Sequence, residues 1–82
     1  MTNKDIQQAM INKLNSWSRD GHKATAVTVD GNYIGAKITA DDQEKFDSVI
    51  LVCDNNGYIY CLCCSGFSRV TTNSWPISDF IS

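Results

Sequence analysis

The sequence is poor in the residues that most catalytic motifs require. Its 82 residues include one proline and one histidine, and its five glycines are separated from one another. Without a glycine-rich loop there is no cradle for phosphate groups, and His22 is the only imidazole that could serve as a base for a nucleophile. This scarcity predicts that the protein is not an enzyme and needs no cofactor.

Clustered positive charge and long apolar runs are also absent. The formal net charge is −2, and no two of the seven basic side chains are adjacent. Nucleic-acid-binding surfaces usually carry clustered lysine and arginine, so charge alone does not indicate a polyanionic partner. No apolar run approaches the roughly 20 residues of a membrane span, and the N-terminus lacks the apolar core of a signal peptide. We therefore expect a cytoplasmic protein without a membrane partner.

Size and composition are typical of one small globular domain over residues 1–82. Hydrophobic residues make up 43% of the chain and charged residues 20%, which argues against a disordered tail. A chain of this length buries a modest core, and such domains often gain stability by self-association. A homo-oligomer is therefore an open alternative.

The N-terminal segment predicts one amphipathic helix over about residues 3–19. The apolar residues that recur at helical spacing are Ile6, Met10, Leu14 and Trp17. Thr2 or Asn3 can cap the start, and Gly21 is a natural terminator.

A first β-hairpin is predicted over about residues 23–39. It turns at Asp30-Gly31 or at Gly31-Asn32, both of which suit a two-residue turn. Either turn places the odd-numbered valines of the first strand and the even-numbered isoleucines of the second on one sheet face. These residues are Val27, Val29, Ile34 and Ile38.

A second hairpin is predicted over about residues 48–64, around Asn55-Asn56-Gly57. Its arms are apolar at consecutive positions, so we expect both faces of these strands to be covered. A last strand is expected over about residues 67–72. The tail, residues 73–82, is expected to form a half-turn that packs Trp75, Ile77 and Phe80 on the body.

The cysteine cluster in YIYCLCCSGF raises the question of a metal or redox site. In a strand, Cys61 and Cys63 point to one face and Cys64 to the other. The predicted hairpin places Cys53 on the Cys64 side, so the four thiols do not converge as zinc ligands do. We therefore expect no metal, and reduced cysteines that act as small buried hydrophobic residues.

The predicted fold class is α+β, with an N-terminal amphipathic helix followed by a four- or five-stranded antiparallel sheet. A bent barrel of the SH3-like or Sm-like kind is the closed variant of this arrangement.

Two stretches resemble the Sm-like fold, in particular the bacterial Hfq-type RNA chaperones. VTVDGNYIGAKI is similar to that family's first motif, and KFDSVILV is similar to its aromatic-Asp segment. The resemblance covers about residues 6–72 and implies a bent five-stranded barrel in an oligomeric ring that binds RNA. However, Cys61 and Leu62 stand where the family has a basic residue and a histidine. The usual RNA-binding groups are therefore largely missing.

The candidate binding residues are the acidic patch and one tyrosine, namely Asp41, Asp42, Glu44, Asp47 and Tyr33. An acidic loop can meet a basic partner, and a tyrosine on a strand can stack on a ligand or sit at the core's edge. With no catalytic constellation, the leading hypothesis is a small non-catalytic protein-binding protein, plausibly a phage or mobile-element inhibitor of a host protein. The alternative is an Sm-like ring that binds RNA or small nucleotides.

Overall fold

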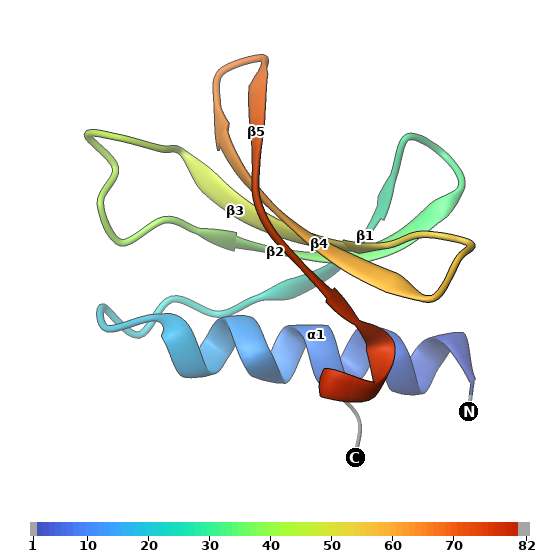
Figure 1. Cartoon of the computed structure of the whole chain (residues 1–82). Coiled ribbons are helices and arrows are strands. Elements are labelled where there is room, and N and C mark those ends of the chain that lie inside the picture. The colour runs from blue at the N-terminus through green and yellow to red at the C-terminus, as the bar shows by residue number, and fades with distance from the viewer. Residues whose placement is uncertain (1, 81–82) are drawn as a thin grey trace.

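A computed structural model of the chain describes residues 2–80 and contains one N-terminal helix followed by a five-stranded antiparallel sheet (Figure 1). The elements are α1 (Asn3–Trp17), β1 (Thr25–Val29), β2 (Tyr33–Thr39), β3 (Ser48–Cys53), β4 (Tyr58–Ser65), β5 (Ser68–Pro76) and the short 3-10 helix η1 (Ile77–Asp79). The predicted α+β class, with a helix before an antiparallel sheet, is confirmed.

The sheet is an open meander in which each strand pairs with its neighbour in sequence, in the order β1-β2-β3-β4-β5. β1 and β5 are thus the two edges, and within residues 2–80 they do not pair with each other. Figure 1 shows a strongly bent sheet with α1 lying across one of its faces. The two faces therefore have different environments.

The start of α1 is fixed by the side chains of Thr2 and Asp5. The Thr2 hydroxyl accepts a hydrogen bond from the Asp5 amide (3.2 Å), and the Asp5 carboxylate accepts one from the Thr2 amide (3.3 Å). This reciprocal capping box satisfies two amides that the helix leaves without partners. The helix ends at Trp17 because Ser18 is already extended, two residues before the predicted end.

The first hairpin has a three-residue loop, Asp30 to Asn32, in place of the predicted two-residue turn. Val29 is paired with Tyr33 across it. Asp30 and Gly31 both have positive φ (52° and 78°), a conformation that glycine and aspartate adopt more readily than most residues. The extra loop residue reverses the predicted alternation, so that Val27 and Val29 face away from Ile34 and Ile38.

The second hairpin also turns through three residues instead of two. The Asp54 carboxylate accepts hydrogen bonds from the amides of Asn56 and Tyr58 (2.9 Å each), and this organises a three-residue loop that ends at Gly57. Cys53 is therefore paired with Ile59 and shares a face with Cys61. The prediction that Cys53 lies on the Cys64 side is wrong, because it assumed a two-residue turn.

One face of the sheet, here called the covered face, carries the main core under α1. Residues of α1 and of the central strands are at most 1% exposed there: Met10, Leu14, Leu51 and Ile59. Gln7 adds a polar link between α1 and this face. Its side-chain amide donates to the carbonyls of Val27 (3.2 Å) and Gly35 (2.9 Å), which are opposite each other on β1 and β2.

The other face, here called the open face, has no helix over it among residues 2–80. Val29, Ile50 and Cys64 are buried there by the curvature of the sheet. Further hydrophobic residues pack beside them but remain partly exposed: Val27, Tyr33, Val52 and Leu62. The prediction that both faces of the second hairpin are covered is thus only partly right.

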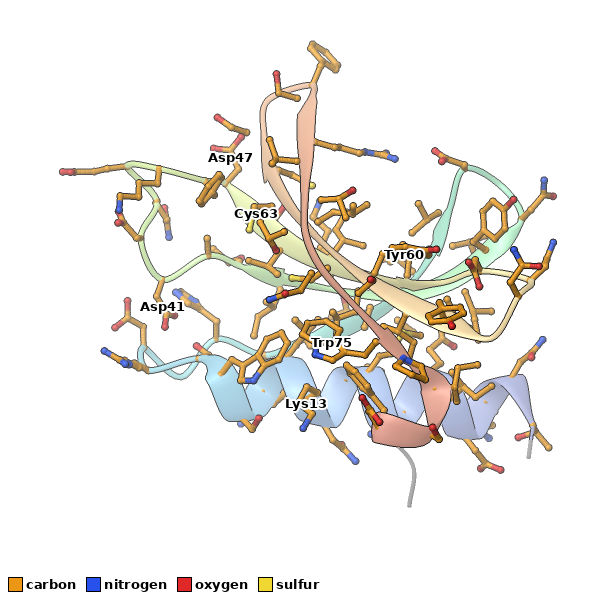
Figure 2. All side chains as sticks on the ribbon, in the orientation of Figure 1. Lys13, Asp41, Asp47, Tyr60, Cys63 and Trp75 are labelled. Atoms are coloured by element: carbon orange, nitrogen blue, oxygen red, sulfur yellow. The ribbon has the colours of Figure 1, made fainter. Side chains whose placement is uncertain are left out.

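The C-terminal part of the chain returns to the covered face. β5 contains one extra residue opposite the Cys61–Leu62 step, and this bulge lets the strand continue past the predicted residue 72 to Pro76. Figure 2 shows Trp75 between the sheet and α1. Its ring lies 5.9 Å from that of Trp17 and 5.4 Å from that of Phe80, measured between centroids, so the tail packs on the body as expected.

Candidate functional site

The acidic loop from Asp41 to Asp47 contains carboxylates of two kinds. Asp47 is turned onto the backbone, where its side chain accepts a hydrogen bond from the Gly66 amide (2.6 Å) and its own amide donates to the Cys64 carbonyl (2.7 Å). These contacts tie the loop to the β4–β5 turn. The sequence predicted a partner contact for Asp47, but its carboxylate braces the fold.

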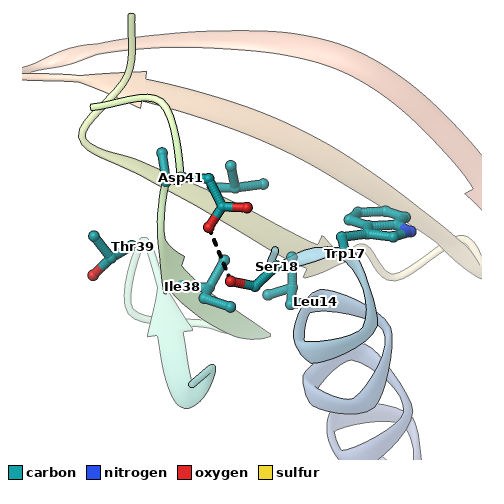
Figure 3. A pocket seen from close by; sticks show the side chains of 8 residues that line it. Leu14, Trp17, Ser18, Ile38, Thr39 and Asp41 are labelled. Atoms are coloured by element: carbon teal, nitrogen blue, oxygen red, sulfur yellow. Dashed lines mark hydrogen bonds between the residues drawn. The ribbon is translucent and has the colours of Figure 1, made fainter. Parts of the chain in front are cut away.

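Asp41 has a similar bracing role at the end of α1. Figure 3 shows its carboxylate directed to Ser18, beside a small pocket of about 70 Å³ that includes Leu14 and Ile38. The carboxylate accepts hydrogen bonds from the Arg19 amide (2.6 Å) and the Ser18 hydroxyl (2.9 Å). The Arg19 bond is the main reason that the pKa of Asp41 lies below its usual value.

Asp41 is also one of three side chains that could hold a cation. Asp20, His22 and Asp41 each offer a ligand atom within 4.8 Å of the others, and the His22 Nε2 lies 3.8 Å from Asp41 Oδ1. Histidine nitrogen and carboxylate oxygen are suitable zinc ligands. A metal would have to compete with the two donors that Asp41 already accepts. The sequence offered only the Asp20–His22 spacing as a signal, because Asp41 is distant in the chain.

Asp42 and Glu44 are the carboxylates of the loop that remain available. Both residues are exposed, and neither side chain forms a hydrogen bond or ion pair with another residue of the described segment 2–80. The Asp42 carbonyl does accept the amides of Lys45 and Phe46 (3.2 Å each), which closes a helical turn. The predicted acidic contact surface is thereby reduced from four side chains to two.

Tyr33 lies on the open face, beside a hollow that the sequence did not predict. The hollow has a volume of about 180 Å³ and is lined by Val29, Asp30, Tyr33, Val52, Asp54, Tyr60 and Leu62. Its lining combines three aliphatic residues with two tyrosines and with Asp30 and Asp54, the two carboxylates that are here called its rim. Figure 2 shows Tyr60 on the side of the sheet away from α1.

The polar groups of the hollow are coupled to one another. Asp54 accepts the Tyr58 amide, which is the main reason for its lowered pKa, and the nearby Tyr60 hydroxyl lowers it further. The Asp54 carboxylate in turn raises the pKa of Tyr60. Asp54 is therefore held as an anion near neutral pH by fixed donors, with the tyrosine ring placed beside it.

Arg69 crosses the open face from the opposite edge of the sheet. It is paired with Cys64 on β4, which places it on the open face. Its guanidinium Nη1 lies 3.1 Å from the Asp30 carboxylate, and the two side chains are 47% and 64% exposed. The rim of the hollow thus already holds one guanidinium, supplied by the chain itself.

The four cysteines are free thiols divided between the two faces. Cys53 and Cys61 lie in the core of the covered face, and Cys64 is buried on the open face. Burial is the main cause that raises the pKa of the Cys53 and Cys61 thiols. A protonated, buried thiol is a poor nucleophile, which fits a packing role for these two residues.

Compared with protein-family models, with curated proteins and with solved structures, the chain gives no significant match. Among residues 2–80, α1 and η1 are both too short and too polar to cross a bilayer.

Proposed function

We propose that the protein is a small non-catalytic binding protein whose open face contacts a partner protein. The observation that supports this most strongly is the set of partly exposed apolar and aromatic side chains on that face, around Tyr33, Val52 and Leu62. Covering the part of their surface that still meets water would be favourable, because removal of apolar surface from water stabilises a complex. Contiguous apolar surface of this kind is typical of interaction sites.

The polar groups around the face favour a protein over a nucleic acid. Asp30 and Asp54 lie at the rim of the hollow, where a phosphate backbone would meet like charge. Tyrosine beside aliphatic residues is, by contrast, a composition enriched in the centres of protein interfaces. The partner we propose therefore carries apolar groups together with positive charge.

The acidic loop contributes to this proposal through Asp42 and Glu44 only. Their free carboxylates can attract a basic partner over several ångströms and raise its association rate more than its final affinity. Asp41 is left out because both of its carboxylate oxygens already accept hydrogen bonds, and Asp47 because its carboxylate holds the loop to the β4–β5 turn.

Two narrower hypotheses remain predictions. Inhibition of a host protein by a phage or mobile-element product is one specific form of protein binding. An Sm-like ring that binds RNA or nucleotides requires a multimer, which light scattering of the purified protein detects directly. A monomer would contradict the ring.

Affinity capture from the native cell tests the proposal when three forms of the chain are compared. The test variant combines Tyr33→Ser with Leu62→Ser on the open face. The control is Val70→Ser, because Val70 is 55% exposed but is paired with Cys63 on the other side of the sheet. Circular dichroism first establishes that both variants fold.

We expect the test variant to recover about tenfold less of the captured protein than the wild type, as loss of central interface side chains usually costs more than 1 kcal/mol. The control should recover wild-type amounts. Equal recovery by all three forms would overturn the proposal, as would an eluate that contains nucleic acid bound through the same residues.

A further inference from the structure

The hollow on the open face combines three features. Its lining includes the aliphatic residues Val29, Val52 and Leu62, the tyrosines Tyr33 and Tyr60, and the two aspartates of its rim, Asp30 and Asp54. Each feature suits a different part of one long cationic side chain. The methylene stem packs on aliphatic surface, the charged group lies against an aromatic ring, and the carboxylates accept its hydrogen bonds.

We propose that this hollow binds an arginine side chain of the partner protein, and that Arg69 occupies its rim in the free chain and is displaced on binding. The inference rests on the proposed function and specifies the chemistry that the open face recognises.

Arg69 shows that this rim holds a guanidinium. Its Nη1 lies 3.1 Å from the Asp30 Oδ1, although the two residues belong to opposite edges of the sheet and are 39 positions apart in sequence. A planar guanidinium can also stack on a tyrosine ring and donate in two directions, which an ammonium group cannot do equally well. Arginine is therefore the expected occupant in preference to lysine.

The contact between Arg69 and Asp30 is suited to exchange. Both side chains are about half exposed or more, and ion pairs of this kind contribute little to stability because water screens them. An incoming arginine that also reaches Asp54 and the tyrosine rings makes contacts that Arg69 does not replace. The free chain thus keeps Asp30 paired without blocking the rim firmly.

A titration followed by amide NMR tests the inference on the whole chain. The probes are N-acetyl-argininamide, its neutral isostere N-acetyl-citrullinamide, and N-acetyl-lysinamide. We expect the arginine probe to shift the amides around Tyr33, Asp54 and Tyr60 in a saturable way. Citrulline should cause no saturable shift, and lysine should bind several-fold more weakly. Equal binding of arginine and citrulline, or tighter binding of lysine, would overturn the inference.

Two variants with the same change of charge show where the arginine probe binds. Asp54→Asn keeps the oxygen that accepts the loop amides but removes the charge, and should weaken arginine binding about tenfold, the usual effect of losing one charged hydrogen bond. Asp42→Asn makes the same charge change in the acidic loop and should leave binding unchanged. An equal loss for Asp42→Asn and Asp54→Asn would show attraction to net charge only and would contradict the assignment.

Arg69→Ala provides the opposite test. It frees Asp30 and should strengthen arginine binding about two- to fivefold, in keeping with the small contribution of an exposed pair. Arg19→Ala removes the same charge beyond the end of α1 and should have no effect. Unchanged binding for Arg69→Ala would overturn the displacement step.

The titration tests the inference and the capture experiment tests the proposed function, so a negative result in one does not decide the other. If the arginine probe does not bind but capture still depends on Tyr33 and Leu62, the inference is wrong and the proposed function stands. If the probe binds but capture is insensitive to these residues, the hollow is a site and the proposed function is wrong.

Discussion

The two faces of the sheet differ in whether other parts of the chain cover them. On the covered face, α1 and the tail seal the core, and Met10, Leu14, Leu51 and Ile59 are at most 1% exposed. On the open face, similar aliphatic residues from the same strands are only half-buried. Strands with apolar residues on both sides need two covering layers, and residues 2–80 supply one. The difference assigns the main core to one face and motivates the proposal that the other face binds a partner.

The largest contrast is expected between two leucines on neighbouring strands. Leu51→Ala on the covered face should lower the free energy of unfolding by about 2–5 kcal/mol, because a fully buried leucine leaves a cavity. Leu62→Ala on the open face should cost less than half as much. Urea denaturation followed by circular dichroism measures both, and equal losses would contradict the division between the faces.

A close backbone contact in β2 gives the next largest effect. A Cβ placed on Gly35 would lie 2.6 Å from the Leu51 carbonyl oxygen and 3.1 Å from the Val29 Cγ2. Gly35→Ala should therefore force β2 and β3 apart and cost about 1–3 kcal/mol, as overpacking usually does. Lys37→Ala, an exposed change on the same strand, is the control. A Gly35→Ala variant as stable as this control would show that the strands approach less closely.

Thiol reactivity distinguishes the sealed core from less protected positions. Cys53 and Cys61 are buried with raised pKa values, whereas Cys63 is half-buried. In the native protein, iodoacetamide should modify Cys63 about tenfold faster than either buried residue, since the thiolate is the reactive form. Mass spectrometry of digested samples gives the rates. Comparable rates in the folded protein would mean that the covered face opens readily.

The smallest expected effect concerns pH and the bracing carboxylates. The pKa of Asp41 is lowered mainly by the Arg19 amide, and that of Asp54 mainly by the Tyr58 amide. A lowered folded-state pKa contributes stability that is complete above the unfolded value of about 3.9 and is lost as pH falls through the folded value. The urea concentration at the unfolding midpoint should therefore decrease as the pH is lowered from about 5.

Asp41→Asn should remove part of this acid dependence, whereas Asp42→Asn should leave the slope as it is. Identical pH profiles for the two variants would show that Asp41 does not brace the loop.

The parts of the fold that were predictable depend on local periodicity. The spacing of Ile6, Met10 and Leu14 identified α1, the alternation of apolar residues identified β1 and β2, and continuous apolar runs identified β3 and β4. Loop length was not predictable in the same way, because Asp30-Gly31 suits two- and three-residue loops alike. One added residue in each hairpin reverses every side chain on the strand before it, and this is why Val27, Val29 and Cys53 were assigned to the wrong faces.

The candidate binding residues, Tyr33 and the four acids of the loop, remain predictions. That Asp41 and Asp47 accept backbone amides was not predictable, because a carboxylate that caps backbone amides looks the same in sequence as one that faces only solvent. The hollow itself joins residues from three separate stretches, around 29–33, 52–54 and 60–62, and Arg69 reaches it from a fourth. Such a combination follows from the strand register, which periodicity does not determine.

Methyl NMR of the chain with and without its captured partner compares the two faces directly. The account predicts that binding shifts the methyl signals of Val27, Val52 and Leu62 on the open face. Those of Met10, Leu14 and Leu51 should stay in place. Shifts confined to the second group, or to the acidic loop alone, would contradict the assignment of the open face as the binding surface.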